Sequence, residues 1–176
     1  MERASIKALY VEEFDREMAT TRKILERVPF GEKAEWQPHE RSMSLGRLAI
    51  HIARLTEMPA NIIGTDSFTF GASGGASPAT KIADAAGLMA AFDAAAAKAR
   101  AALVGTDDAH FAGEWELTFE NGTTRRQVFK GSRAMAYRSL FMNHLIHHRA
   151  QLGVYLRLNG IAIPGSYGPS ADEPIA

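Results

Sequence analysis

The sequence has no cysteine among its 176 residues. This absence excludes disulfides, thiolate nucleophiles and cysteine-ligated zinc, and it leaves histidine and carboxylate side chains as ligands for any metal ion. The chain also lacks an excess of charge of one sign, because 20 Lys and Arg residues balance 20 Asp and Glu residues. Since neither a basic patch nor an acidic tail is present, we expect no nucleic-acid partner.

Long apolar runs are missing as well. No window of about 18 uncharged apolar residues exists, and Glu2 and Arg3 put charges where a signal peptide would need its apolar segment. We therefore expect no membrane association and a cytoplasmic location. The remaining composition, 46% apolar and 23% charged residues, is ordinary for a globular protein. Its length favours one domain over residues 1–176.

Apolar residues recur at three- and four-residue spacings in four stretches, which predicts four helices. These helices cover about 4–27, 44–62, 81–104 and 131–158. Pro59 is expected to bend or fray the last turn of the second helix. The glycine- and serine-rich stretch 64–80 predicts an irregular loop.

Between the third and fourth helices the pattern changes to strands. Residues 114–119 alternate polar and apolar side chains, Asn121-Gly122 is a strong hairpin signal, and 123–130 can return as a second strand. A two-stranded ribbon must pack on helices to be stable. The sequence thus predicts an all-α fold, a four-helix bundle with crossover connections and a small β-hairpin between helices 3 and 4.

Two histidines of the fourth helix have the spacing of a metal-binding pair. His144 and His148 are four residues apart, so their side chains share one helix face, roughly 5–6 Å apart at Cβ. Zinc peptidases use a similar pair, but there a glutamate follows the first histidine as general base. Leu145 occupies that position here, which disfavours a peptidase.

His51 of the second helix is the candidate third ligand. It stands at the edge of an apolar stripe and therefore faces other helices more than water. In a bundle, metal sites are commonly built from facing helices, so His51 can join His144 and His148. Three imidazoles leave a coordination position open, which is typical of a reactive or ligand-binding site.

Five other residues are candidates to surround the metal or line a pocket: Trp36, His147, Arg149, Gln151 and Tyr155. His147 points about 100° away from His148 and is interpreted as a residue at the rim of the site. Arg149 would form a structural ion pair or contact a substrate. Trp36 and Tyr155 would pack in the core or form a cavity wall. His110, before the hairpin, is expected at the surface.

Several motifs together resemble those of one known family. They are Trp36-x-Pro38, Ser42-Met43-Ser44-Leu45-Gly46-x-Leu48-Ala49-x-His51, His144-x-x-x-His148-Arg149-Ala150-Gln151-Leu152 and Pro164-x-x-Tyr167-Gly168-Pro169-Ser170. On these residues the chain resembles the DinB-like proteins of the DinB/YfiT superfamily of metalloenzymes, which are bacterial. The resemblance spans essentially the full chain, and its most specific part is His51 with His144-x-x-x-His148-Arg149.

The resemblance implies an up-down-down-up four-helix bundle in which His51, His144 and His148 bind a divalent metal ion, most often nickel or zinc. It also implies a homodimer. Members with assigned roles include transferases that use a low-molecular-weight thiol such as mycothiol, bacillithiol or glutathione. The stretch 64–131, which would shape a substrate pocket, carries no mark of a particular subgroup.

Three functions remain open at this point. The first is a metal-dependent thiol S-transferase acting on a small molecule, in which the ion holds a thiolate for attack on an electrophile. The second is a metal-dependent hydrolase that uses bound hydroxide. The third is a non-enzymatic, stress-associated bundle that binds a metal or ligand.

Overall fold

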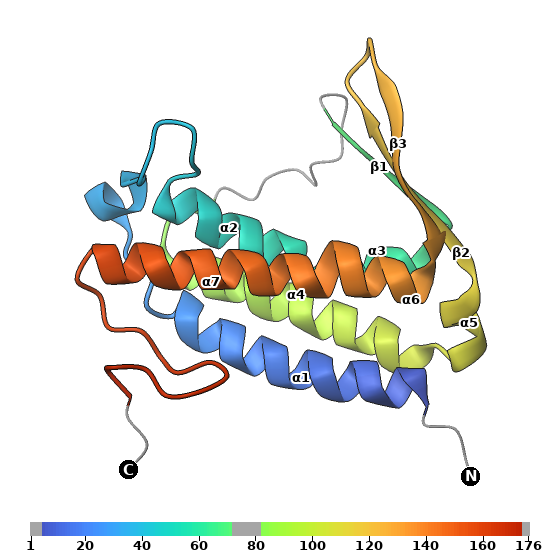
Figure 1. Cartoon of the computed structure of the whole chain (residues 1–176), viewed down its shortest axis with the longest axis horizontal. Helices are drawn as coiled ribbons and strands as arrows, with labels where there is room; N and C mark the ends of the chain where they lie inside the picture. Colours follow the sequence, from blue (N-terminus) through green and yellow to red (C-terminus); the bar gives the residue numbers. More distant parts are fainter. Residues whose placement is uncertain (1–4, 72–81, 174–176) are drawn as a thin grey trace.

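The computed structural model describes residues 5–71 and 82–173 of the chain. This part is mostly helical and carries a small three-stranded sheet at one end (Figure 1). The sheet stands beside the helices rather than within them. The predicted mixture of long helices and a small β element is therefore confirmed, whereas the sheet has one strand more than predicted.

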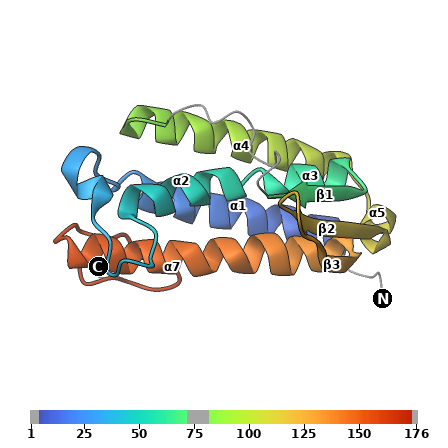
Figure 2. The same cartoon turned by 90° about the horizontal axis from the view of Figure 1, so that it is seen from above.

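Four long helical segments lie side by side (Figure 2). They are α1 (Ile6–Leu25), α2 (Leu45–Leu55) continued by α3 (Met58–Gly64), α4 (Ala85–Gly105), and α6 (Arg133–Ala136) continued through a π-helical turn, η2 (Tyr137–Met142), into α7 (Asn143–Leu158). The colours show that α1 and α7 run in one direction and α2, α3 and α4 in the other. α2 packs against both α4 and α7, and α1 does the same.

Short elements fill the connections. A 3₁₀ turn, η1 (Gly31–Glu35), precedes α2, and the short helix α5 (Asp108–Ala112) precedes the sheet. The first turn of a helix is stabilised by a side chain that accepts a hydrogen bond from one of its free backbone N–H groups. Ser44 accepts from the N–H of Arg47 at 3.4 Å, and Asp84 accepts from that of Gly87 at 2.7 Å.

The second predicted helix, 44–62, is in fact two helices. α2 ends at Leu55, and α3 begins at Met58 with Pro59 in its first turn. Proline tolerates that position because the first N–H groups of a helix have no partner within the helix. Pro59 thus starts a helix rather than fraying the end of one.

The fourth predicted helix, 131–158, begins later and is not uniform. Strand β3 extends to Ser132, so the helical run starts at Arg133. The π-helical turn at Tyr137–Met142 then interrupts the α-helical hydrogen bonding just before His144. Such single turns occur mostly inside α-helices and frequently at functional sites.

The sheet has the order β1-β2-β3. β2 (Glu114–Glu120) and β3 (Arg125–Ser132) form the predicted antiparallel hairpin, with Gly122 at φ 86° in its turn. β1 (Ser67–Phe70) pairs in parallel with β2. The prediction of an irregular loop over 64–80 is therefore wrong for 67–70, while its residues from 72 on lie outside the described part.

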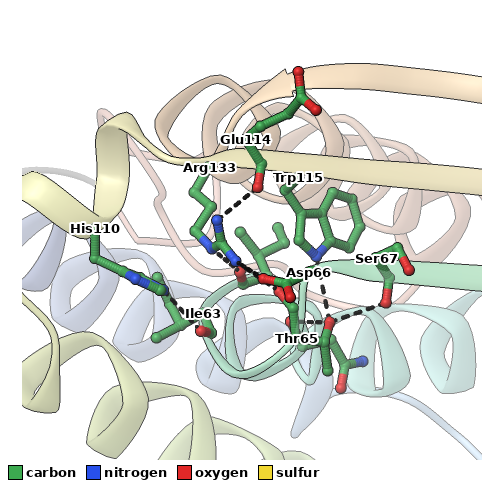
Figure 3. Close-up of polar contacts among 10 residues, drawn as sticks. Ile63, Thr65, Asp66, Ser67, His110, Glu114, Trp115 and Arg133 are labelled. Carbon is green, nitrogen blue, oxygen red and sulfur yellow. Dashed lines mark hydrogen bonds and ion pairs between the residues drawn. The ribbon is translucent and has the colours of Figure 1, made fainter.

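Arg133 ties the sheet to the helices (Figure 3). Its buried guanidinium donates to the carbonyl oxygens of Ile62 at 3.0 Å, Thr65 at 3.0 Å and Glu114 at 2.6 Å. Nearby, Nε2 of His110 lies 2.9 Å from the carbonyl oxygen of Ile63. The interpretation of His110 as a plain surface residue is therefore wrong, because its ring helps to fix α3 beside the sheet.

Candidate metal centre

Three histidine rings from two helices meet in one place. His51 lies on α2, and His144 and His148 lie one turn apart on α7. Nε2 of His144 is 2.8 Å from Nε2 of His148 and 3.5 Å from Nε2 of His51. One ligand nitrogen from each ring lies within 4.8 Å of the other two. The packing of α2 against α7 thus brings together the three residues that the sequence singled out.

The hydrogen bonds behind two of the rings fix which nitrogen faces the cluster. Nδ1 of His144 lies 3.3 Å from the carbonyl oxygen of Leu140, which can only accept a hydrogen bond. Nδ1 of His148 lies 2.7 Å from Oε1 of Gln151. Protons on these Nδ1 atoms leave a lone pair on each Nε2. Two lone pairs facing each other at 2.8 Å repel, and a cation between them removes that repulsion.

The spacing of the nitrogens agrees with a shared ion. Zn–N bonds of 2.0–2.1 Å at tetrahedral angles place two ligand nitrogens about 3.3 Å apart. The observed separations of 2.8 and 3.5 Å fall on either side of that value. Imidazole nitrogen suits zinc and nickel among other ions. The three-histidine cluster could therefore hold a divalent metal ion.

The electrostatic surroundings keep the rings neutral. The pKa of His51 is lowered from 6.5 to about 4, chiefly by burial and then, in decreasing order, by His148, His144, Arg47 and Arg54. Burial also lowers the pKa of His144 and of His148. Near neutral pH the rings are consequently uncharged, which is the form that binds metals.

The histidine cluster offers too few protein ligands to fill the coordination shell of a metal ion. Within residues 5–71 and 82–173, the cluster contains three histidines and neither a fourth histidine nor a carboxylate. Structural zinc sites are normally closed by four protein ligands, whereas catalytic sites keep one position for water or substrate. The donor set therefore matches an open site.

Gln151 and His147 take different places around the cluster. Gln151 accepts the hydrogen bond from His148 and thereby orients a candidate ligand. The exposed ring of His147 lies 4.9 Å from that of His148, centroid to centroid, on the solvent side of the cluster.

Arg149 turns away from the histidines toward α1. Its buried guanidinium forms an ion pair with the buried carboxylate of Glu17, with 2.7 Å between Nη2 and Oε2. It also donates to Oγ1 of Thr21 at 3.1 Å and to the hydroxyl of Tyr167 at 2.8 Å. Of the two roles considered for Arg149, its contacts support the structural ion pair and not a place in the pocket.

Trp36 and Tyr155 pack on each other. Their rings meet edge to face with centroids 5.5 Å apart, and both side chains are partly buried. Tyr155 lies one turn beyond Gln151 on α7, and Trp36 precedes α2. The pair therefore packs the segment that precedes α2 against α7.

Sequence reasoning missed the partners of Arg149. Only 3% of Glu17 is exposed, which is unusual for a glutamate. Tyr167 lies in the tail and bonds to Glu17 through its hydroxyl at 2.9 Å. The one available signal in the sequence was the position of Glu17 on the same helix face as the apolar residues Phe14 and Met18 and the small Thr21.

The fold and the site define a mostly helical protein with an open three-histidine cluster that is compatible with a metal ion. The chain belongs to the DinB family, whose model matches residues 1–175. A comparison with curated proteins gives no match. In the described part, no helix is long and apolar enough to cross a membrane.

Two crystal structures have the same fold. A DinB-like protein from Bacillus cereus ATCC 10987 is 21% identical, with a TM-score of 0.67 over 93% of this chain and 98% of that chain. A DinB-like protein from Bacillus subtilis is also 21% identical, with a TM-score of 0.63 over 95% of this chain and 99% of that chain. At this identity the likeness concerns the fold alone.

Proposed function

We propose that this protein is a divalent-metal-dependent enzyme, a thiol S-transferase acting on a small electrophile, in which His51, His144 and His148 hold the ion. The observation that carries the proposal is the convergence of three Nε2 atoms with no fourth protein ligand in the described part of the chain. A bound zinc or nickel ion would supply Lewis acidity, lowering the pKa of a thiol placed at its open position.

The chain's own residues would prepare this site in three ways. The three neutral rings provide ligand nitrogens without needing to lose a proton near pH 7. The hydrogen bonds from His144 to Leu140 and from His148 to Gln151 hold the rings in one orientation. Trp36 and Tyr155 would form the wall against which an organic substrate packs.

One feature of the chain favours thiol transfer over hydrolysis, and a second indicates where the thiol would come from. Metal-assisted hydrolysis commonly uses a carboxylate beside the ion as general base, and none joins the histidines in the described residues. The chain also has no cysteine, so a thiol nucleophile must come from a cosubstrate. A low-molecular-weight thiol fits the open position.

The finer description of the fold belongs to the same proposal. We infer that the four helical segments form an up-down-down-up bundle, with the ion between the second and fourth segments. Support comes from the helix directions in Figure 2 and from the packing of α2 on α7. In such a bundle a small substrate reaches the ion from the side on which His147 is exposed.

The test compares turnover with two substrate panels. Metal-loaded protein is assayed for conjugation of several small thiols to an aryl halide and to an epoxide, and for hydrolysis of ester and amide substrates. We expect thiol-dependent turnover that is lost on chelation and in His148→Ala, and that metal restores in the wild type only. His39→Ala is the matched control, because His39 lies exposed in a loop outside the cluster. Turnover independent of metal would overturn the proposal.

A further inference from the structure

Two arginines stand beside His51 on the outer face of α2. Arg47 precedes His51 by four residues and Arg54 follows it by three. At 3.6 residues per turn these positions lie about 40° and about 60° from His51 around the helix axis. Both side chains are exposed, whereas His51 is partly buried. The solvent side of the cluster is therefore bordered by two guanidinium groups.

The helices that carry the histidines hold no acidic residue at all. α2 and α7 contain four arginines and neither aspartate nor glutamate. On α7, Arg149 is neutralised by Glu17, and Arg157 by Asp172. The two arginines of α7 are thus already balanced by neighbouring carboxylates.

The two arginines of α2, unlike those of α7, have no ion-pair partner among the described residues. Within residues 5–71 and 82–173, neither guanidinium takes part in an ion pair or a side-chain hydrogen bond. The acidic residues nearest along the chain, Glu40 and Glu57, form none with them either. α2 therefore presents positive charge that no described carboxylate balances.

This charge lies close to the cluster. Arg47 and Arg54 stand about one helical turn from His51, on the same side of α2, so their electric field extends to the solvent side of the metal centre. A positive field repels a divalent cation, so these arginines do not serve to retain a metal ion. It attracts an anion instead, and guanidinium groups match carboxylate and phosphate oxygens in geometry as well as in charge.

We propose that Arg47 and Arg54 form an anion-recognition rim beside the three-histidine cluster, so that the preferred ligand is a small thiol that also carries an acidic group, a carboxylate or a phosphate. The inference rests on the proposed function. The sulfur of such a ligand would occupy the open position, and its acidic group would lie against the guanidinium groups at the protein surface. No covalent step is involved, because the rim contributes to binding alone.

The test uses three thiols of similar size and different charge. Cobalt(II) is bound to the purified protein, and mercaptoacetate, 2-mercaptoethanol and cysteamine are titrated in turn while the sulfur-to-cobalt charge-transfer band is recorded. Two guanidinium charges about 8 Å from a carboxylate in water change affinity by about fivefold. Relative to the double variant Arg47→Gln/Arg54→Gln, we expect the wild type to bind mercaptoacetate about fivefold more tightly, 2-mercaptoethanol equally well and cysteamine about fivefold more weakly. Added salt should shrink both differences.

Variants test whether the preference for acidic thiols comes from Arg47 and Arg54. The double variant Arg47→Gln/Arg54→Gln gives the reference affinities, which contain the intrinsic differences in thiol pKa among the three thiols. Cobalt(II) itself should bind to this variant a few-fold more tightly than to the wild type. Arg16→Gln is the matched control, because Arg16 is likewise exposed and forms no ion pair in the described part; it should keep the wild-type order. Competition by acetate and by inorganic phosphate distinguishes the two acidic groups.

The outcomes separate this inference from the proposed function. Wild-type protein that binds no cobalt(II) would overturn both. Protein that binds cobalt(II) and thiols, but with the same affinity for each thiol in the wild type and in the double variant, would overturn the anion-recognition rim and leave the metal-dependent function standing.

Discussion

The buried ion pair between Glu17 and Arg149 gives the sharpest prediction about stability. The two side chains are only 4% and 3% exposed, and their closest atoms are 2.7 Å apart. Glu17→Gln removes the negative charge and leaves the guanidinium buried without its counter-ion. The hydroxyl of Tyr167 also loses a charged acceptor. The substitution changes almost no volume, so packing should stay the same.

The magnitude follows from the geometry. Removing one partner of a buried pair typically costs about 3–5 kcal/mol, because an unpaired charge stays in a medium of low polarity. Thr21 and the carbonyl oxygen of Glu17 still accept from Arg149 in the variant, which favours the lower end of that range. For a chain of this size each kcal/mol shifts Tm by about 2–4 °C. Glu17→Gln should therefore lower Tm by roughly 6–12 °C.

Urea denaturation of the metal-free protein measures this effect, and a double variant controls for it. Glu17→Leu/Arg149→Met removes both charges and keeps apolar volume, so it should unfold within about 2 kcal/mol of the wild type. Glu13→Gln is the second control, because its ion pair with Arg138 is partly exposed and should contribute about 1 kcal/mol or less. A loss under 1 kcal/mol for Glu17→Gln would refute the reasoning.

Three further predictions concern other parts of the chain. Arg133→Met should cost about 3 kcal/mol in urea denaturation, because one buried and two partly buried carbonyl oxygens lose this donor. A change under 1 kcal/mol would contradict this. Gly71→Ala should speed amide exchange along β2, since Gly71 has φ 142° and an added Cβ would lie 1.8 Å from the carbonyl oxygen of Glu120; unchanged exchange would contradict the close approach. The hydrogen bond from Arg157 lowers the pKa of Asp172, so its carboxylate stabilises the fold above pH 3.8 and loses that effect as the pH falls further. The Tm difference between wild type and Asp172→Asn should therefore narrow below pH 3.8, and a difference independent of pH would count against it.

Local signals in the sequence predicted much of the helical framework. Apolar periodicity placed the long helices close to their observed ends, and Asn121-Gly122 marked the hairpin turn. These signals succeed because each depends on residues within a few positions of one another. The pairing of His144 with His148 belongs to the same class, since a helix fixes it locally.

The approach of His51 to His144 was predicted although 93 positions separate them, but three other features that depend on distant partners escaped prediction. β1 has only four residues and is defined by its parallel pairing with β2, nearly fifty positions away. The π-helical turn before His144 leaves no periodicity of its own. Glu17 and Arg149 look like ordinary charged residues until α1, α7 and the tail close around them. Tertiary packing, and not propensity, decided each of these cases.

The convergence of His51 with His144 and His148 on one ion is the central claim, and a metal titration tests it most directly. Metal-free protein is titrated with zinc and nickel by calorimetry, beside His51→Ala and His39→Ala. We predict one ion per chain, retained in His39→Ala. Loss of a residue that hydrogen-bonds to a metal ligand typically lowers metal affinity by roughly 10–100-fold. Because His51→Ala removes a ligand itself, the metal affinity of this variant should fall by more than that. Equal affinity of His51→Ala and wild type, or no binding by the wild type, would contradict the account.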